Sequence, residues 1–180
     1  MSRPAVFLDR DGVLNEPVVR RGRPRPPETT AALRVLPGVR EVCRELSGAG
    51  LALVCVTNQP DIARGTQDLA TVTAMNEHLR ALLGLDEVVV CPHDDDDGCV
   101  CRKPRPGMIL DAARRLHLDV SHSITIGDRW RDIEAGRAAG PWTVLVDYGY
   151  TERRPDHPDL IIKGLEEAVP WIIDKANSPS

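Results

Sequence analysis

An apolar run that ends in two closely spaced aspartates most constrains the fold and the chemistry of this chain. The run covers residues 5–8, and Asp9 and Asp11 follow it directly, ahead of Gly12. Similar apolar runs alternate with helical patterns along the chain, which predicts a parallel sheet with helices on both faces. Such sheets bind their ligands at the carboxyl ends of the strands. The sequence therefore predicts a site where one carboxylate attacks phosphorus and the other transfers protons.

Two carboxylates beside a phosphate need a cation, because like charges raise each other's pKa. Mg²⁺ prefers oxygen ligands, so Asp9 and Asp11 predict a magnesium site. A strand that ends in an ordinary polar turn is the alternative, and the two aspartates alone leave both possibilities open. Three further segments, at residues 56–59, 101–104 and 126–129, favour the site.

Each of these segments follows a predicted strand and carries groups that suit a phosphate. Thr57 and Asn58 can donate hydrogen bonds to phosphate oxygens, although a capped turn before Pro60 is the alternative. Arg102 and Lys103 can offset phosphate charge, although a solvated basic pair is the usual outcome for such residues.

An aspartate pair follows the fourth predicted strand. Asp128 can complete the coordination shell of a magnesium ion. Asp132, one helical turn later, either supports that shell or favours the start of a helix, where negative charge is stabilising. The sequence leaves these two roles of Asp132 open.

The remaining patterns predict one α/β domain. Strands are predicted over residues 5–8, 51–56, 88–90, 123–126, 143–146 and 160–162, and helices over 38–46, 68–83, 108–116, 132–139 and 165–173. Residues 16–30 are rich in proline and arginine, which predicts a loop without regular structure. A chain of 180 residues is typical of one domain, and no repeat is visible, so we expect a single domain over residues 1–176.

Composition argues against several classes of partner. The formal net charge of −4 and the aromatic content of 3% do not indicate a nucleic-acid-binding surface. No signal-peptide pattern is present, and no apolar stretch approaches the roughly 20 residues that span a bilayer. We therefore expect a cytoplasmic monomer that acts on a small molecule and binds neither nucleic acid nor membrane.

A second cluster of candidate ligands lies in a loop over residues 91–101. It pairs a Cys-x-His with a Cys-x-Cys, and its members are Cys91, His93, Cys99 and Cys101. Three thiols and one imidazole can bind tetrahedral zinc, and four protein ligands leave no open position, so the zinc would be structural. Three unrelated thiols and a loop histidine are the alternative.

This loop leads directly into Arg102 and Lys103, so a bound zinc would fix where these two cations point. The acidic run 94–97 lies inside the loop. Acidic runs are usually solvated, and we expect this one to point away from an anionic substrate.

Taken in order, the motifs resemble those of the haloacid dehalogenase (HAD) superfamily of phosphohydrolases, over nearly the whole chain to about residue 147. The matching residues are Asp9-Arg10-Asp11-Gly12, Thr57-Asn58-Gln59, Lys103 and Gly127-Asp128. The resemblance implies a Rossmann-like fold, and the gaps between the motifs are too short for a cap domain.

The resemblance also implies a role for each residue. Asp9 would form an aspartyl-phosphate, and Asp11 would act as general acid and base. Thr57 and Lys103 would bind the transferring phosphoryl group. Magnesium would be held by Asp9, by Asp11 through its backbone carbonyl, and by Asp128. The expected substrate-binding residues are Asn58, Gln59, Arg102 and Arg129.

The zinc loop narrows the resemblance to the branch of subfamily IIIA that holds heptose bisphosphate phosphatases and histidinol-phosphate phosphatases. Residues 102–108 and 58–65 are more similar to the heptose enzymes, whereas the short gap inside the zinc loop resembles the other group. Pro60-Asp61 and Arg129 depart from the usual heptose pattern. The leading expectation is removal of the C7 phosphate of D-glycero-D-manno-heptose 1,7-bisphosphate. The alternatives are a histidinol-phosphate phosphatase, a polynucleotide 3′-phosphatase and a non-catalytic zinc protein that binds phosphate groups.

Overall fold

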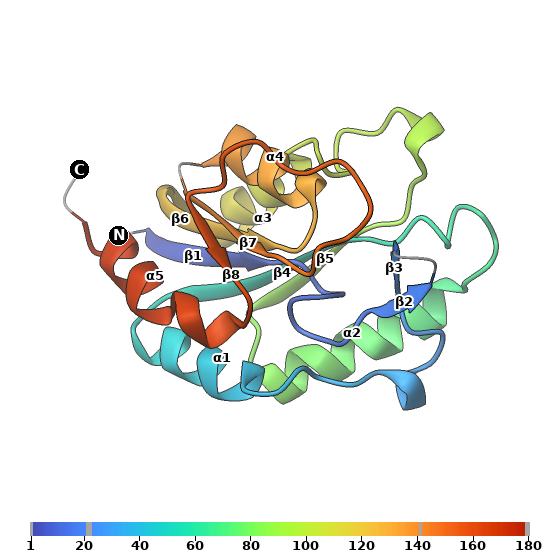
Figure 1. The fold of residues 1–180 in the computed structure, drawn as a ribbon, viewed down its shortest axis with the longest axis horizontal. Coiled ribbons are helices and arrows are strands. Elements are labelled where there is room, and N and C mark those ends of the chain that lie inside the picture. Colours follow the sequence, from blue (N-terminus) through green and yellow to red (C-terminus); the bar gives the residue numbers. More distant parts are fainter. Residues whose placement is uncertain (1, 21–22, 141, 179–180) are drawn as a thin grey trace.

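Six parallel strands form a central sheet in the computed structural model, which describes residues 2–20, 23–140 and 142–178 (Figure 1). Their order across the sheet is β5 (Glu87–Cys91), β4 (Ala52–Asn58), β1 (Arg3–Leu8), β6 (Leu118–Gly127), β7 (Trp142–Val146) and β8 (Leu160–Ile162). The chain builds outward from β1 to β5, then returns to the other side of β1 and continues to β8. The direction of winding therefore reverses beside β1, and open α/β sheets bind ligands at this switch point.

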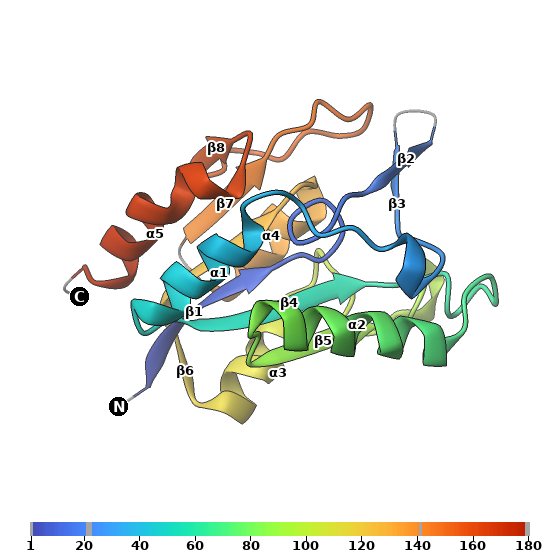
Figure 2. The same cartoon turned by 90° about the horizontal axis from the view of Figure 1, so that it is seen from below.

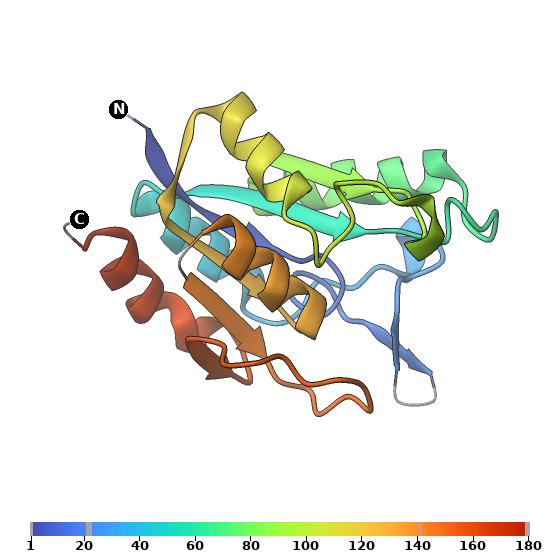
Figure 3. The same ribbon diagram turned by 90° about the horizontal axis from the view of Figure 1, so that it is seen from above.

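Helices cover both faces of the sheet. One face carries α1 (Val39–Gly48), α2 (Leu69–Leu83) and α5 (Val169–Ala176), whereas α3 (Gly107–Leu116) and α4 (Trp130–Ala139) cover the other (Figures 2 and 3). Alternate residues of β1 enter the two cores, with Leu8 on the first face and Phe7 on the second. The predicted fold class, a Rossmann-like parallel sheet between two helical layers, is confirmed. None of the described helices is both long and apolar enough to cross a membrane.

The predicted strands and helices are all present, with differences at their ends. β6 begins at Leu118, five residues before the predicted start, and its pairing with β1 shifts register near Pro4. The predicted last helix is a 3-10 turn, Leu165–Ala168, followed by α5. Pro170 lies in the first turn of α5, where its missing N–H has no helical partner to lose.

The prediction of an irregular loop over residues 16–30 is wrong in part. Strands β2 (Val18–Arg20) and β3 (Arg23–Arg25) form an antiparallel hairpin in which Val19 pairs with Pro24. Proline is tolerated because each strand of a two-stranded ribbon is an edge, with backbone groups that need no sheet partner. The hairpin extends beyond the carboxyl ends of β1 and β4 (Figure 2), and one short 3-10 turn, Thr30–Ala32, follows it.

Candidate active site

The ends of three adjacent strands bring the predicted residues together at the switch point. Leu8 of β1 is in register with Cys55 of β4 and with Ile126 of β6, so the carboxyl ends of the three strands lie side by side, and β4 continues three residues further. Asp9, Thr57 and Asp128 lie at these ends, and all three are buried. Asp9 and Asp128 directly follow β1 and β6, and Thr57 is the second-last residue of β4, so the parallel register places the three side by side.

Lys103 enters this site from the loop that follows β5. Its ammonium nitrogen lies 2.8 Å from Oδ1 of Asp9 and 2.5 Å from Oδ1 of Asp132, and it donates to the carbonyl oxygen of Val56 at 2.8 Å. Burial alone would lower the pKa of Lys103, but the charges of Asp132 and Asp9 outweigh it and raise the pKa above its usual value. Lys103 therefore remains a cation throughout the physiological pH range.

Three carboxylates lie close together beside Lys103, and two of them, Asp9 and Asp132, pair with it. Asp9, Asp128 and Asp132 each offer an oxygen within 4.8 Å of the others. Burial raises the pKa of Asp9 to about 7 against the opposing charge of Lys103, and burial together with the charge of Asp9 also raises the pKa of Asp128. Three carboxylates and one ammonium leave an excess of negative charge, which a divalent cation would remove. Carboxylate oxygens are also the ligands that Mg²⁺ prefers, so this donor set fits magnesium.

Asp132 favours the start of α4, one of the two roles that the sequence left open, and its support of a magnesium shell stays a prediction. Its Oδ2 accepts a hydrogen bond from the backbone N–H of Arg129 at 3.0 Å, which caps the first turn of α4. Its Oδ1 pairs with Lys103, as described above. One carboxylate thus ties the start of α4 to the lysine of the site.

The side chain of Asp11 lies outside the carboxylate cluster and is held by its own donors. It accepts hydrogen bonds from Arg10 at 3.0 Å, from Asn15 at 3.0 Å and from Gln59 at 2.9 Å. Arg10 is fully buried and also donates to Asn76 of α2 at 3.0 Å. These donors hold the Asp11 carboxylate apart from the cluster, beside the cavity, and the expected role of its backbone carbonyl as a metal ligand stays a prediction.

Asn58 and Gln59, both expected to bind substrate, mainly hold other site residues. The side chain of Asn58 forms two hydrogen bonds with the backbone of Lys103, at 3.0 and 3.1 Å, and it also lines the cavity. The amide of Gln59 bridges Asp11 and Thr57, with 2.8 Å to the hydroxyl of Thr57. Gln59 does not line the cavity, and its amide orients two residues that do, so a direct contact of Gln59 with substrate stays a prediction.

A cavity of about 320 Å³ opens above these residues. Its floor includes Asp9, Asp11, Thr57 and Lys103. Its walls carry five arginines from four different segments of the chain, namely Arg25, Arg64, Arg102, Arg129 and Arg131. One guanidinium group can donate to two phosphate oxygens at once. Five such groups in the walls therefore suit a substrate that carries more than one anionic group.

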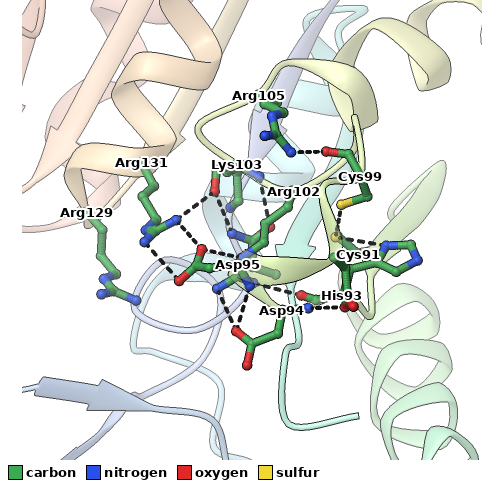
Figure 4. Close-up of polar contacts among 12 residues, drawn as sticks. Cys91, His93, Asp94, Asp95, Cys99, Arg102, Lys103, Arg105, Arg129 and Arg131 are labelled. Atoms are coloured by element: carbon green, nitrogen blue, oxygen red, sulfur yellow. Dashed lines mark hydrogen bonds and ion pairs between the residues drawn. The ribbon is translucent and has the colours of Figure 1, made fainter. Parts of the chain in front are cut away.

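The expectation that residues 94–97 point away from the substrate is wrong for Asp95, which Figure 4 shows among the arginines. Asp95 lines the cavity and accepts hydrogen bonds from Arg102 at 2.8 Å and from Arg131 at 2.9 Å. Asp94 binds Arg64 at 2.7 Å, and this hydrogen bond lowers the pKa of Asp94 to about 2. Arginines crowded around one cavity repel each other, and these two carboxylates offset that repulsion.

The four predicted zinc ligands lie together. Figure 4 shows three of them, Cys91, His93 and Cys99, beside this network. Sγ of Cys91 lies 3.3 Å from Sγ of Cys101, 3.7 Å from Sγ of Cys99 and 3.6 Å from Nδ1 of His93. Zinc bond lengths of about 2.3 Å to sulfur and about 2.0–2.1 Å to nitrogen imply tetrahedral edges of about 3.8 and 3.6 Å. The cluster therefore has the donors and nearly the spacing of a tetrahedral metal site.

Sequence reasoning missed several residues that support the site. Arg131 and Glu152 are two of them, and Glu152 pairs with Arg129 at 2.6 Å. Asn76 is another, and its one sequence signal is a polar residue within the apolar face of α2. Tyr150 donates to Asp128 at 2.9 Å. Its segment follows the predicted strand 143–146, and that position, shared with the other site segments, was the signal that could have found it.

Gly12 carries a first testable prediction, because it touches Asp128 through its backbone. Its φ is +95°, and a Cβ there would lie 2.0 Å from Oδ2 of Asp128. We expect Gly12→Ala to lower the free energy of unfolding by about 1–3 kcal/mol beyond backbone strain, as overpacking does. Gly84→Ala is the matched control, since Gly84 has φ +68° and no neighbour within 4 Å. Urea unfolding measures both variants. If they lost the same free energy of unfolding, the close approach of Gly12 to Asp128 would be contradicted.

Comparisons with known proteins agree with this geometry. A family model described as HAD-hydrolase-like matches residues 100–168. The D-glycero-beta-D-manno-heptose-1,7-bisphosphate 7-phosphatase of Bordetella bronchiseptica is 38% identical over 151 residues, which cover 80% of this chain and 82% of the relative. The enzyme of the same name from Escherichia coli strain K12 is 36% identical, with 99% of this chain and 98% of the relative covered. The crystal structure of the Bordetella bronchiseptica D,D-heptose 1,7-bisphosphate phosphatase, complexed with magnesium and phosphate, superposes with a TM-score of 0.75 at 30% identity, over 96% of this chain and 99% of the other.

Proposed function

The chain belongs to the family of HAD-like phosphatases, and we propose that it removes the C7 phosphate of D-glycero-D-manno-heptose 1,7-bisphosphate. The observation that carries this proposal is the buried cluster of Asp9, Asp128, Asp132 and Lys103 beneath a cavity with arginine walls. A sugar bisphosphate carries two anionic groups. One can lie against Asp9 and Lys103 while the arginines bind the other. Relatives that act on this substrate, by name, cover nearly the whole chain.

The reaction proceeds in two steps on this chain's own residues. An oxygen of Asp9 attacks phosphorus, the bond from phosphorus to the C7 oxygen breaks, and Asp11 gives that oxygen a proton. Asp11 then takes a proton from water, and the water oxygen attacks the aspartyl-phosphate. Inorganic phosphate leaves and the Asp9 carboxylate is restored. Thr57 and Lys103 hold the phosphoryl oxygens, and Lys103 offsets their charge.

Two metals complete the proposal. Magnesium would be held by Asp9, the backbone carbonyl of Asp11 and Asp128, and it would offset negative charge between the nucleophile and the phosphoryl group. Zinc would be held by the four side chains of the 91–101 loop and would be structural. The catalytic and zinc-binding groups lie on one sheet and its loops, so we propose a single catalytic domain over residues 1–176, and we propose that it acts as a monomer.

Phosphate release from a panel of substrates tests the function. The panel holds both anomers of D-glycero-D-manno-heptose 1,7-bisphosphate, histidinol phosphate, fructose 1,6-bisphosphate and a 3′-phosphorylated oligonucleotide, each with Mg²⁺ and with EDTA. We expect one heptose anomer to exceed all other compounds in kcat/KM by about 100-fold or more, a difference of at least about 2.7 kcal/mol. Turnover of histidinol phosphate alone would replace the proposed substrate. No turnover of any compound, with or without EDTA, would contradict an enzymatic function on these substrates.

The pKa of Asp9 gives a prediction for metal binding. The raised values of Asp9, about 7, and of Asp128 mean that both carboxyls hold protons in the metal-free protein at acidic pH. Mg²⁺ binds the deprotonated groups, so protons compete with it and its affinity should rise with pH through about 7. We expect the Kd for Mg²⁺ to fall by about tenfold or more between pH 6 and pH 8, with proton release on binding. Isothermal titration in two buffers of different ionisation enthalpy measures both, and a Kd independent of pH would contradict the assignment.

A further inference from the structure

Two stacked tyrosines lie against the magnesium site from the loop between β7 and β8. The rings of Tyr148 and Tyr150 have centroids 5.5 Å apart, and their planes differ by 26°. Gly149 between them has φ +69°, a backbone conformation that other residues rarely adopt. This loop extends beyond the carboxyl ends of the sheet, and it is the orange-red segment in Figure 3. Neither tyrosine has a part in the two chemical steps above.

The two tyrosine hydroxyls donate to different groups, and only one of these groups is a proposed metal ligand. Tyr150 donates to Oδ2 of Asp128 at 2.9 Å, and Tyr148 donates to the carbonyl oxygen of Gly12 at 3.0 Å. Tyr150 therefore binds a carboxylate, whereas Tyr148 binds backbone. The two residues share one loop and one stack, so they differ mainly in what their hydroxyls contact.

The two oxygens of Asp128 have different surroundings. Oδ2 lies between the hydroxyl of Tyr150 and the backbone of Gly12, where a Cβ would come within 2.0 Å of it. Oδ1 is buried and receives no hydrogen bond from any part of the chain that the structure describes. A buried polar atom without a hydrogen-bond partner lowers stability, so a ligand bound to this oxygen would remove that cost. A cation bound by Asp128 would lie toward Asp9 and Asp132, whose oxygens are within 4.8 Å of its own.

We propose that Tyr150 is the positioning residue of the magnesium site: its hydroxyl holds Oδ2 of Asp128 and thereby presents Oδ1 to the cation. This inference rests on the magnesium site of the proposed function. Metal-binding carboxylates are themselves hydrogen-bonded, and loss of such an outer partner typically costs about 10–100-fold in metal affinity. Without the hydroxyl, the Asp128 carboxylate can rotate about its side-chain bonds and must be ordered again when the metal binds.

The pair Tyr150→Phe and Tyr148→Phe tests the proposal, because each variant loses one hydroxyl and keeps the ring stack. Isothermal titration with Mg²⁺ at pH 8 gives the Kd of each variant. We expect Tyr150→Phe to weaken binding about 10–100-fold and Tyr148→Phe to change it by less than about threefold. The Mg²⁺ concentration that half-saturates turnover should rise by the same factor in Tyr150→Phe.

A second measurement keeps the test decisive when binding is too weak for titration. Mg²⁺ raises the free energy of unfolding by RT ln(1 + [Mg²⁺]/Kd), so urea unfolding at several Mg²⁺ concentrations also gives the Kd. An unchanged Kd in Tyr150→Phe overturns the proposal, and so do equal losses in both variants, which would point to loop packing. Wild-type protein that does not bind Mg²⁺ at all would instead contradict the metal site of the proposed function.

Discussion

Replacement of Asp9 by asparagine should abolish phosphate release, with kcat reduced by at least about 10⁴-fold, as expected when a covalent nucleophile is removed. An amide has nearly the same shape as the carboxyl group but cannot form the aspartyl-phosphate. Lys103 keeps Asp132 as a partner at 2.5 Å, so no unpaired cation is left in the core. Phosphate release under saturating substrate and Mg²⁺ measures the loss.

The same variant should fold at least as stably as the wild type at pH 8 in the absence of Mg²⁺. The pKa of Asp9 is raised in the folded protein to about 7 from 3.8, so its contribution to stability is fully present below pH 3.8 and is lost as pH rises through about 7. Above that pH the ionised Asp9 disfavours the fold, and asparagine removes this effect. Urea unfolding at pH 8 measures the comparison, and a clear loss of stability would contradict it.

Asp61→Asn is the matched control for activity. Asp61 lines the same cavity and pairs with Arg64, but it lies outside the carboxylate cluster. We expect this variant to change kcat by less than about tenfold, within the range of an indirect effect on a wall of the cavity. Turnover of Asp9→Asn comparable to that of Asp61→Asn would exclude Asp9 as the nucleophile.

The fold and the centre of the site could be predicted because both depend on local sequence. A strand buried on both faces is apolar throughout, and the residue that follows it lies at the carboxyl end of the sheet, where ligands bind. Asp9, Thr57 and Asp128 each come directly after the apolar run of such a strand, so parallel pairing alone brings them together. Lys103 lies after a long loop, and the prediction of its place depended on its resemblance to a known motif.

The contacts that orient these groups could not be predicted, because they join residues far apart in the sequence. Asn58 binds the backbone of Lys103, 45 positions away, and Tyr150 binds Asp128, 22 positions away. Asp95 illustrates the consequence: its sequence context is an acidic run, which is usually solvated, yet Arg131 of α4 reaches it across 36 positions. Periodicity shows which face of an element is buried but not which polar group it will meet.

Loss of zinc should have the second large effect, on stability and on catalysis together. The loop 91–101 contains only one three-residue 3-10 turn, Asp95–Asp97, so few backbone hydrogen bonds hold it in place. The free energy of zinc binding is also free energy of folding, and we expect Cys99→Ser to lose zinc and about 3–5 kcal/mol of stability. For a chain of this size, that corresponds to a Tm lower by about 10 °C. Zinc content by mass spectrometry and thermal unfolding measure both changes.

The catalytic consequence follows from the hydrogen bonds at the end of this loop. Arg102 donates to the carbonyl oxygen of His93 at 3.0 Å, and Lys103 follows it into the site, so a loosened loop would displace both cations. We expect kcat/KM of Cys99→Ser to fall about 100-fold, since small misplacements of binding groups have effects of that order. Cys43→Ser is the matched control. Cys43 is buried in the core under α1, α2 and α5, on the opposite face of the sheet from the zinc ligands, and lies outside the ligand cluster. That variant should lose stability but keep one zinc per chain and its kcat/KM. If Cys99→Ser kept its zinc and its Tm, the 91–101 loop would not be a structural zinc site. The position of Lys103 would then depend on its contacts with Asp9, Val56, Asn58 and Asp132.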